Sequence, residues 1–405
     1  MSHSIKEPHP ETYFENLNGL RFLCFLSVFF YHCFDTEFNQ ISTSHIYRFV
    51  KYGMFSNANL GVNFFFVLSG FLITFLITKE KKLNGTISIT KFWTRRVLRI
   101  WPLYFFAVFF GFVVFPVLKS FFGQMSSETA SIWYYLTFLN NFDVIQKGVP
   151  DASNLGVLWS IAVEEQFYLV WPVILSALLI RRYWLAFVAV IAISWIYRML
   201  NDVGILYHYH TLSCIGDMAI GALGAWLVSE SSKFKSAIVN LSAYQIGIIY
   251  LAFTLVFFFR AQLFYELYAI RVIERSVIAF VILLIILEQC YARNSFFKLS
   301  NFRLISGLGI ISYGLYCFHL IGILFAKTVT HILGYNTELW QVLLLIPAVA
   351  LIISIAISKV SYVYFEKPFL KLKDERFSWR RKLEVEDHET ASDAHQSRSL
   401  TASSS

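Results

Sequence analysis

Charged residues are scarce in this sequence. Only 15% of its 405 residues are Asp, Glu, Lys or Arg, and 57% are hydrophobic, whereas a soluble domain has about 25% charged and about 45–50% apolar residues. This composition excludes an ordinary soluble protein. The apolar residues form continuous runs instead of alternating with polar ones, which excludes a transmembrane barrel and predicts membrane-spanning helices.

Cysteine is also rare. The five cysteines are Cys24, Cys33, Cys214, Cys290 and Cys317, and all lie within or beside apolar runs. Their spacing matches no set of metal ligands. We therefore expect small packing residues and no metal site.

Three further absences limit the possible classes. No basic region or small-residue cleavage site precedes the first apolar run, so we expect that run itself to serve as the insertion signal. No internal repeat is evident, which weighs against a transporter built from repeats. The net charge of +8 reflects Lys and Arg gathered on one side of a membrane, and it gives no indication of nucleic-acid binding.

Ten apolar runs are long enough to cross about 30 Å of hydrocarbon. The sequence therefore predicts an all-α polytopic membrane protein with ten transmembrane helices. Placing both termini in the cytoplasm (N-in/C-in) puts most of the 34 Lys and Arg residues on that side, in accord with the positive-inside rule. The runs cover approximately residues 17–36, 60–78, 100–119, 156–180, 184–200, 210–229, 243–260, 270–290, 304–328 and 340–364.

A single transmembrane domain is expected at residues 13–373. A cytoplasmic segment, 1–12, precedes it, and a polar cytoplasmic tail, 374–405, follows and becomes disordered toward its end. Residues 79–99 are expected to form a basic cytoplasmic loop. The outer segment 120–155 contains "SIWYYLTFLNNF", which is too short to span and is expected to form a re-entrant or interfacial helix.

Polar residues inside an expected span are costly and therefore indicate function. The stretch "LNGLRFLCFLSVFFYHCF" carries Arg21 and His32, whose separation is three helical turns plus about 20°. They share one face, and Asn18 lies near the same stripe. Alone, Arg21 is typical of an interfacial anchor and His32 of a packed core residue. Their shared face indicates the wall of a polar cavity instead.

Other spans carry polar or titratable residues in the same outer half of the bilayer. Close helix packing around Ser69 and an aromatic belt at the tyrosines are simpler explanations for some of them. Two adjacent glutamates inside an apolar run have no such simple explanation. We expect these residues to line the cavity together: Ser69, Glu164, Glu165, Asp217, Tyr313 and His319.

The residue types suit acyl transfer. A histidine beside a carboxylate can act as a general base and deprotonate a hydroxyl that attacks an acyl group. "RRVLR" places Arg95, Arg96 and Arg99 near the cytoplasmic end of the third span, where they suit the phosphates of a cytosolic donor. Ordinary positive-inside anchoring explains these arginines equally well.

Six motifs, in order along residues 13–373, resemble the acyltransferase-3 family of membrane O-acyltransferases. Each motif is weak alone, but together and in this order they are specific. They are "NGLRFLCFLSVFFYH", "GVNFFFVLSGFLIT", "KFWTRRVLRIWPLYF", "LWSIAVEEQFYLVWP", "SYGLYCFH" and "SYVYFEKPF".

The resemblance implies ten transmembrane helices, an acyl-CoA donor (expected to be acetyl-CoA) reached from the cytoplasm, and an acceptor hydroxyl on a carbohydrate or lipid-linked glycan outside. It implies His32 as the catalytic base or acyl relay, Arg21 as its partner, and Arg96 with Arg99 as ligands of CoA. We further expect Glu164 or Glu165 to polarise His32. A bacterial inner membrane is the expected location. The short polar tail indicates a stand-alone form without a periplasmic hydrolase-like domain.

Two other functions remain open at this stage. Buried His, Glu and Asp residues also suit a proton-coupled transporter, and a membrane scaffold is the third possibility. The missing repeat and the six ordered motifs weigh against the transporter, and the buried acids weigh against the scaffold. Neither the acceptor nor the choice between direct transfer and an acyl-histidine intermediate follows from the sequence.

Overall fold

The structure, a computed structural model, describes residues 14–372 except 122, 124, 126 and 202–203. Within these ranges the regular structure is helical and no strand occurs, which confirms the all-α prediction. The expected segment 1–12 and tail 374–405 lie outside the described residues.

Each of the ten apolar runs overlaps a long helix, although the helix at run 100–119 begins earlier, at Ile89. Helices are required there because a backbone surrounded by hydrocarbon must satisfy its own N–H and C=O groups. The long helices are α1 Asn16–Cys33, α4 Leu60–Asn84, α5 Ile89–Phe109, α10 Trp159–Ala177, α11 Tyr183–Leu200, α13 Thr211–Glu230, α15 Ala243–Phe264, α16 Tyr268–Tyr291, α18 Ser312–Ile332 and α19 Ile346–Ser361.

Shorter helices connect or extend them. They are α2 Asn39–Ser42, α3 His45–Arg48, α6 Phe115–Phe121, α7 Ile132–Leu136, α8 Asn140–Lys147, α9 Ser153–Gly156, α12 Gly204–Tyr209, α14 Ser232–Val239 and α17 Arg303–Ile310. The chain also forms π-helical turns at Phe49–Met54, Phe110–Val114, Gln341–Leu345 and Tyr362–Glu366, and 3-10 turns at Ile180–Arg182 and Leu299–Asn301.

Eight of the described helical segments are both long and apolar enough to cross a membrane, so this is an integral membrane protein. The two remaining long helices, α1 and α16, are more polar: α1 carries Arg21 and His32, and α16 carries Glu274, Arg275 and Glu288. Ten crossings and the N-in/C-in orientation therefore stay predictions. The eight are Leu60–Asn84, Ile89–Phe121, Asn154–Ala177, Ile180–Leu200, Gly204–Glu230, Ala243–Phe264, Ser312–Ile332 and Gln341–Leu372.

The expected basic loop at 79–99 is wrong, because most of it is helical. α4 continues to Asn84 and α5 begins at Ile89, so four residues connect them. Long Lys and Arg side chains can reach water from a helix end, so the charges do not force the backbone to unwind. Gly85 ends α4 with φ of +73°, a left-handed conformation that favours glycine.

The outer segment also differs from expectation. Two short helices, α7 and α8, cover the region of "SIWYYLTFLNNF", where a single helix was expected. Phe138 lies between them with φ of +55°, a conformation that interrupts a right-handed helix.

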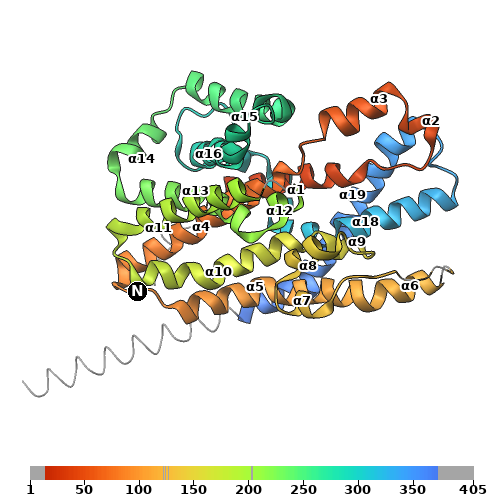
Figure 1. Cartoon of the computed structure of the whole chain (residues 1–405), viewed down its shortest axis with the longest axis horizontal. Coiled ribbons are helices and arrows are strands. Elements are labelled where there is room, and N and C mark those ends of the chain that lie inside the picture. The colour runs from red at the N-terminus through yellow and green to blue at the C-terminus, as the bar shows by residue number, and fades with distance from the viewer. Residues whose placement is uncertain (1–13, 122, 124, 126, 202–203, 373–405) are drawn as a thin grey trace, which may run out of the picture.

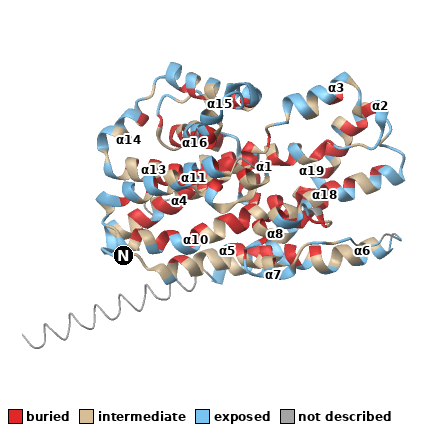
Figure 2. Ribbon diagram, in the orientation of Figure 1, coloured by how far each residue is buried: buried red, intermediate tan, exposed pale blue. Residues whose placement is uncertain are grey.

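α4 and α13 form the centre of the bundle. The most apolar stretch of each is 67% buried, against 22% for α15. A Cβ on Gly70 would lie 1.9 Å from the Met218 carbonyl oxygen, so glycine lets the two backbones touch, as in membrane helix pairs. Figure 1 shows α10 running beside this pair. In Figure 2 the buried residues gather on these central helices, while the outer helices expose apolar faces suited to lipid.

The cysteines pack as small residues. Cys24, Cys33, Cys214 and Cys317 are buried, Cys290 is half-buried, and all five are free.

Candidate functional site

Two cavities lie inside the helix bundle. We call the first the arginine cavity; its volume is about 280 Å³, and Arg21, Arg96 and Arg99 contribute to its lining. We call the second the histidine cavity; its volume is about 500 Å³, and His32 contributes to its lining. Val62 of α4 and Tyr316 of α18 line both cavities. The two spaces therefore meet at these two side chains.

Helix α1 connects the cavities. Arg21, near its beginning, lines the arginine cavity, and its Nη1 donates to Asn18 Oδ1 at 3.0 Å. His32, near its end, lines the histidine cavity. Eleven residues of helix rise by about 16 Å, so the shared face that the sequence predicts places its two polar ends in separate chambers. Asn18 holds Arg21 and does not itself line either cavity.

Helix α5 supplies two arginines to the arginine cavity. Arg96 and Arg99 are three residues apart on one face and both line it. The Arg96 guanidinium lies 5.5 Å from the ring centres of Phe92 and Tyr168, within the range of a cation–π interaction. Arg95 points off this face, and its Nη2 donates to Glu80 Oε2 at 3.2 Å.

The adjacent glutamates of α10 diverge, because neighbouring residues point about 100° apart on a helix. Glu164 lines the arginine cavity and accepts from Ser69 Oγ at 3.1 Å and from Tyr168 Oη at 2.6 Å. Glu165 turns toward α5 and accepts from Trp101 Nε1 at 2.8 Å. Neither glutamate lines the chamber that holds His32.

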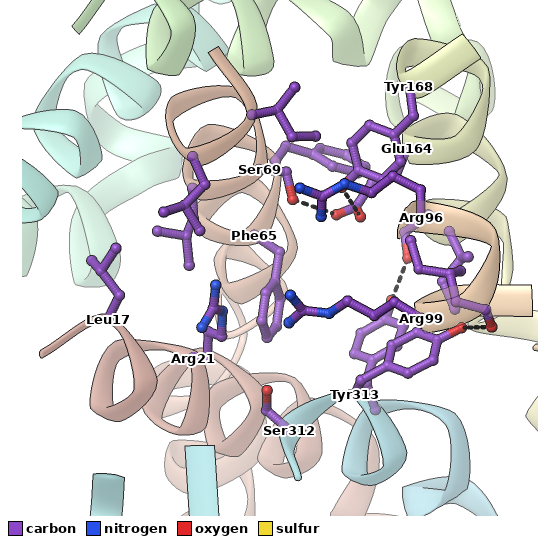
Figure 3. Close-up of a pocket in the computed structure, with 18 of the residues that line it drawn as sticks. Leu17, Arg21, Phe65, Ser69, Arg96, Arg99, Glu164, Tyr168, Ser312 and Tyr313 are labelled. Atoms are coloured by element: carbon purple, nitrogen blue, oxygen red, sulfur yellow. Dashed lines mark hydrogen bonds between the residues drawn. The ribbon is translucent and has the colours of Figure 1, made fainter. Parts of the chain in front are cut away.

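Figure 3 shows the arginine cavity from within. Arg21, Arg96 and Arg99 come from two helices and surround one space, with Phe65 between Arg21 and Arg99. Ser69 and Tyr313 also line it, whereas the sequence predicted that they share one cavity with His32. Three guanidinium groups thus face the single carboxylate of Glu164, and the cavity is cationic. Guanidinium groups bind phosphates by charge-assisted, often bidentate, hydrogen bonds.

His319 lies behind His32 and outside both linings. The two ring centres are 5.5 Å apart, and His319 is fully buried. Its Nδ1 lies 2.8 Å from the carbonyl oxygen of Tyr316. Among the residues that the structure describes, its Nε2 has no hydrogen-bond partner. The neighbour of His32 is thus a second histidine, where the sequence predicted a carboxylate.

Asp217 is connected to the histidine cavity through hydrogen bonds with two other residues. It is fully buried and accepts from Asn63 Nδ2 at 2.9 Å and from Arg275 Nη2 at 2.6 Å. Asn63 and Arg275 both line the histidine cavity, whereas Asp217 does not. Asp217 therefore anchors the wall of the chamber from behind.

The sequence interpretation missed several residues of the histidine cavity. Arg275 was detectable by the same rule that found Glu164, since "IERSV" places charges inside an apolar run. His208 and Tyr209, from the short α12, had no comparable signal. The sequence also carried no signal for the hydrogen bond of 2.6 Å between Tyr316 Oη and Ser160 Oγ, which joins α18 to α10.

Asp35 lies just beyond α1 and contributes to the lining of the histidine cavity. Its carboxylate is 3.5 Å from Lys51 Nζ and 3.2 Å from Lys327 Nζ. Burial raises the pKa of Asp35, but the two ammonium groups lower it by more than burial raises it. This pKa therefore lies below its usual value. The carboxylate is charged at neutral pH and balances the lysines.

No group of three or more His, Cys, Asp or Glu side chains within the described ranges is arranged to hold a metal ion.

These observations define a polytopic helical membrane protein with a cationic chamber and a histidine chamber that meet inside the bundle. The family model Acyl_transf_3, described as an acyltransferase domain, matches residues 14–359. The chain belongs to this acyltransferase family.

Three relatives show the extent of the similarity. A Staphylococcus aureus (strain COL) protein named "Putative O-acetyltransferase SACOL0978" is 26% identical over 91% of this chain and 59% of its own length. "Putative peptidoglycan O-acetyltransferase YrhL" of Bacillus subtilis is 27% identical over 88% of this chain and 55% of its own. "Peptidoglycan O-acetyltransferase OatA" of Listeria monocytogenes is 30% identical over 41% of this chain and 25% of its own. The chain thus spans less than two thirds of the length of these relatives. No solved structure matches it.

Proposed function

We propose that this protein is a membrane O-acyltransferase that moves an acetyl group from acetyl-CoA to a hydroxyl of a glycan acceptor. The observation that carries the proposal is the meeting of a cationic cavity with a histidine-lined cavity at Val62 and Tyr316. One chamber suits a phosphorylated donor, and the other suits a hydroxyl that must lose a proton.

The donor binds in the arginine cavity. Its phosphates are held by Arg96 and Arg99 and, from the facing helix, by Arg21. Glu164 fixes Ser69 and Tyr168 by hydrogen bonds and so holds the wall against which the donor lies. The thioester end points toward Val62 and Tyr316.

His32 is the general base in the histidine cavity. Its imidazole accepts the proton of the acceptor hydroxyl, and the freed oxygen forms a bond to the thioester carbonyl carbon. The bond between carbon and sulfur then breaks, and CoA leaves as a thiolate that takes up a proton. The acceptor thus loses a proton and gains an acetyl group, CoA loses the acetyl group and gains a proton, and no other reactant is needed.

The distribution of basic residues supports a cytoplasmic donor. The arginine cavity extends along α4 from Val62 to Leu76, toward the end of that helix where Lys79, Lys81 and Lys82 lie. Arg95 lies beside Arg96 on α5. The positive-inside rule assigns such an end to the cytoplasm. The acceptor then enters from the other face, and a bacterial cytoplasmic membrane is the setting that the organisms of the relatives favour.

The names of two relatives include peptidoglycan, so soluble peptidoglycan fragments are the first acceptor to test. Purified full-length protein in lipid nanodiscs receives acetyl-CoA and these fragments, and the release of CoA thiol and the acetylated glycan are measured. We expect release that depends on the fragments and is lost in His32→Ala, with the variant still folded by size-exclusion chromatography.

A transporter would give a different result. Vesicles containing the protein would then show glycan-dependent proton uptake without release of CoA thiol. Full transfer by His32→Ala would remove His32 from the role of base.

A further inference from the structure

We infer that Val62 and Tyr316 set the length of the acyl group that the protein transfers and limit it to short chains. The inference rests on the proposed function and adds a specificity determinant to it. It starts from the fact that these two residues line both cavities. An acyl group held on a donor in the arginine cavity must reach His32 past them.

Tyr316 is fixed in place. Its hydroxyl lies 2.6 Å from Ser160 Oγ and donates to the Val157 carbonyl oxygen at 3.2 Å. The edge of the Phe65 ring packs against it, with ring centres 5.9 Å apart. The aromatic ring therefore cannot swing aside to admit a larger group without losing two buried hydrogen bonds, which is costly in an apolar interior.

Val62 is the second residue that lines both cavities, and its side chain is also rigid. A β-branched side chain in a helix has one strongly preferred rotamer, and α4 is held by its close contact with α13 at Gly70. A passage between the cavities at these residues is therefore bounded by a rigid aromatic ring and a rigid branched side chain. Such a site discriminates by size, and one methylene in an apolar pocket changes specificity by about 10- to 200-fold.

The test compares acetyl-, propionyl- and butyryl-CoA in the nanodisc assay described above. Val62→Ala shortens one side of the passage by two methyl groups. We expect the ratio of kcat/KM for butyryl-CoA to kcat/KM for acetyl-CoA to rise about tenfold or more. Val62→Ile narrows the passage, and we expect a lower kcat for acetyl-CoA with unchanged CoA binding.

Val67→Ala is the matched control, because Val67 lies on the same helix as Val62 and undergoes the same chemical change but lines neither cavity. We expect the ratio of kcat/KM for butyryl-CoA to kcat/KM for acetyl-CoA in this variant to match that of the wild type. Tyr316→Phe keeps the ring and removes its two hydrogen bonds, so we expect a smaller shift in the same direction as Val62→Ala.

An unchanged ratio in folded Val62→Ala would overturn the inference, as would an equal rise in Val67→Ala. If Val62→Ala does not fold, unchanged acetyl transfer by Val62→Ile overturns it instead. Wild-type protein that releases no CoA at all refutes the proposed function itself, a result distinct from transfer that ignores Val62.

Discussion

His32 and His319 lie with their ring centres 5.5 Å apart and their planes inclined by 44°. A carbonyl oxygen only accepts, so the contact of 2.8 Å between His319 Nδ1 and the Tyr316 carbonyl places a proton on Nδ1. Nε2 of the neutral ring then offers a lone pair, and it has no partner among the described residues. His319 therefore contacts His32 by ring packing and not by a hydrogen bond, at the place where the sequence predicted a carboxylate.

His319→Gln tests whether this packing positions His32. We expect kcat for acetyl transfer to fall about tenfold or more, because the proposed base, His32, loses the ring that packs against it. KM for acetyl-CoA should stay the same, since we propose that the donor binds in the other cavity. Steady-state kinetics separates the two, and the pH profile of kcat should change shape. An unchanged profile with altered KM would point to a general packing defect instead.

Arg96→Ala and Arg99→Ala should each raise KM for acetyl-CoA about tenfold, the loss expected for one charge-assisted hydrogen bond. Arg95→Ala is the natural control, because Arg95 neighbours Arg96 in sequence but pairs with Glu80 outside the cavity lining. Initial rates over a range of acetyl-CoA concentrations measure all three. Equal effects of the Arg95 and Arg96 variants would show that only overall positive charge matters.

Glu164→Gln and Glu165→Gln separate two residues that the sequence could not distinguish. Glu164 accepts from Ser69 with one carboxylate oxygen and from Tyr168 with the other. The NH₂ group that replaces one of these oxygens in glutamine cannot accept, so one of the two hydrogen bonds is lost. We expect kcat/KM to fall about tenfold. In Glu165→Gln the new amide keeps an oxygen for the Trp101 N–H, so we expect a change of about threefold or less. The reverse order of effects would restore Glu165 as the functional acid.

Much of the fold follows from hydropathy, because bilayer thickness and backbone hydrogen bonding leave helices as the only solution for long apolar runs. The runs at 60–78 and 243–260 coincide with α4 and α15 for this reason. The ends of the helices could not be predicted from hydropathy, since α4 and α5 extend into basic sequence that composition assigned to a loop. Charge indicates contact with water, but it does not say whether the backbone there is helical.

Gly70→Ala should destabilise the bundle. The added Cβ would meet the backbone oxygen of Met218 at 1.9 Å, and backbone cannot move as a side chain can, so we expect a cost of about 1–3 kcal/mol or more. Gly247→Ala, within α15, is the comparison because open space surrounds its new methyl group; we expect a gain of about 0.5–1 kcal/mol. Thermal unfolding in detergent measures both. A similar midpoint for the two variants would refute the close contact.

A pH effect is expected outside the bilayer, at Asp151. Burial raises the pKa of Asp151, but hydrogen bonds from Lys119 and from the Ser127 N–H lower it by more than burial raises it. The pKa therefore lies below its usual value. The carboxylate stabilises the folded segment fully above that usual value, and this contribution is lost as the pH falls through the lower pKa of the folded state. Limited proteolysis between about pH 5 and about pH 3 should show increasing cleavage near residue 151.

Asp151→Asn should be cleaved more readily at the upper end of this pH range and should depend less on pH across it. Identical pH dependence in both proteins would show that other carboxylates control the segment.

The candidate site was only partly predictable. Helical periodicity on α1 aligned Arg21 with His32, because that relation is local to one helix. The pairing of Asp217 with Asn63 and Arg275 joins three helices that are distant in sequence, and no periodicity within one helix reveals which helices touch. For the same reason a carboxylate partner was predicted for His32, whereas tertiary packing supplies His319.

The proposed narrow boundary at Val62 and Tyr316 has an electrical consequence. A continuous water-filled pore through the bundle would conduct ions and collapse the gradient that the membrane maintains. In the proposed reaction only the acyl group passes Val62 and the tethered Tyr316, so the route needs no water-filled pore that would conduct ions.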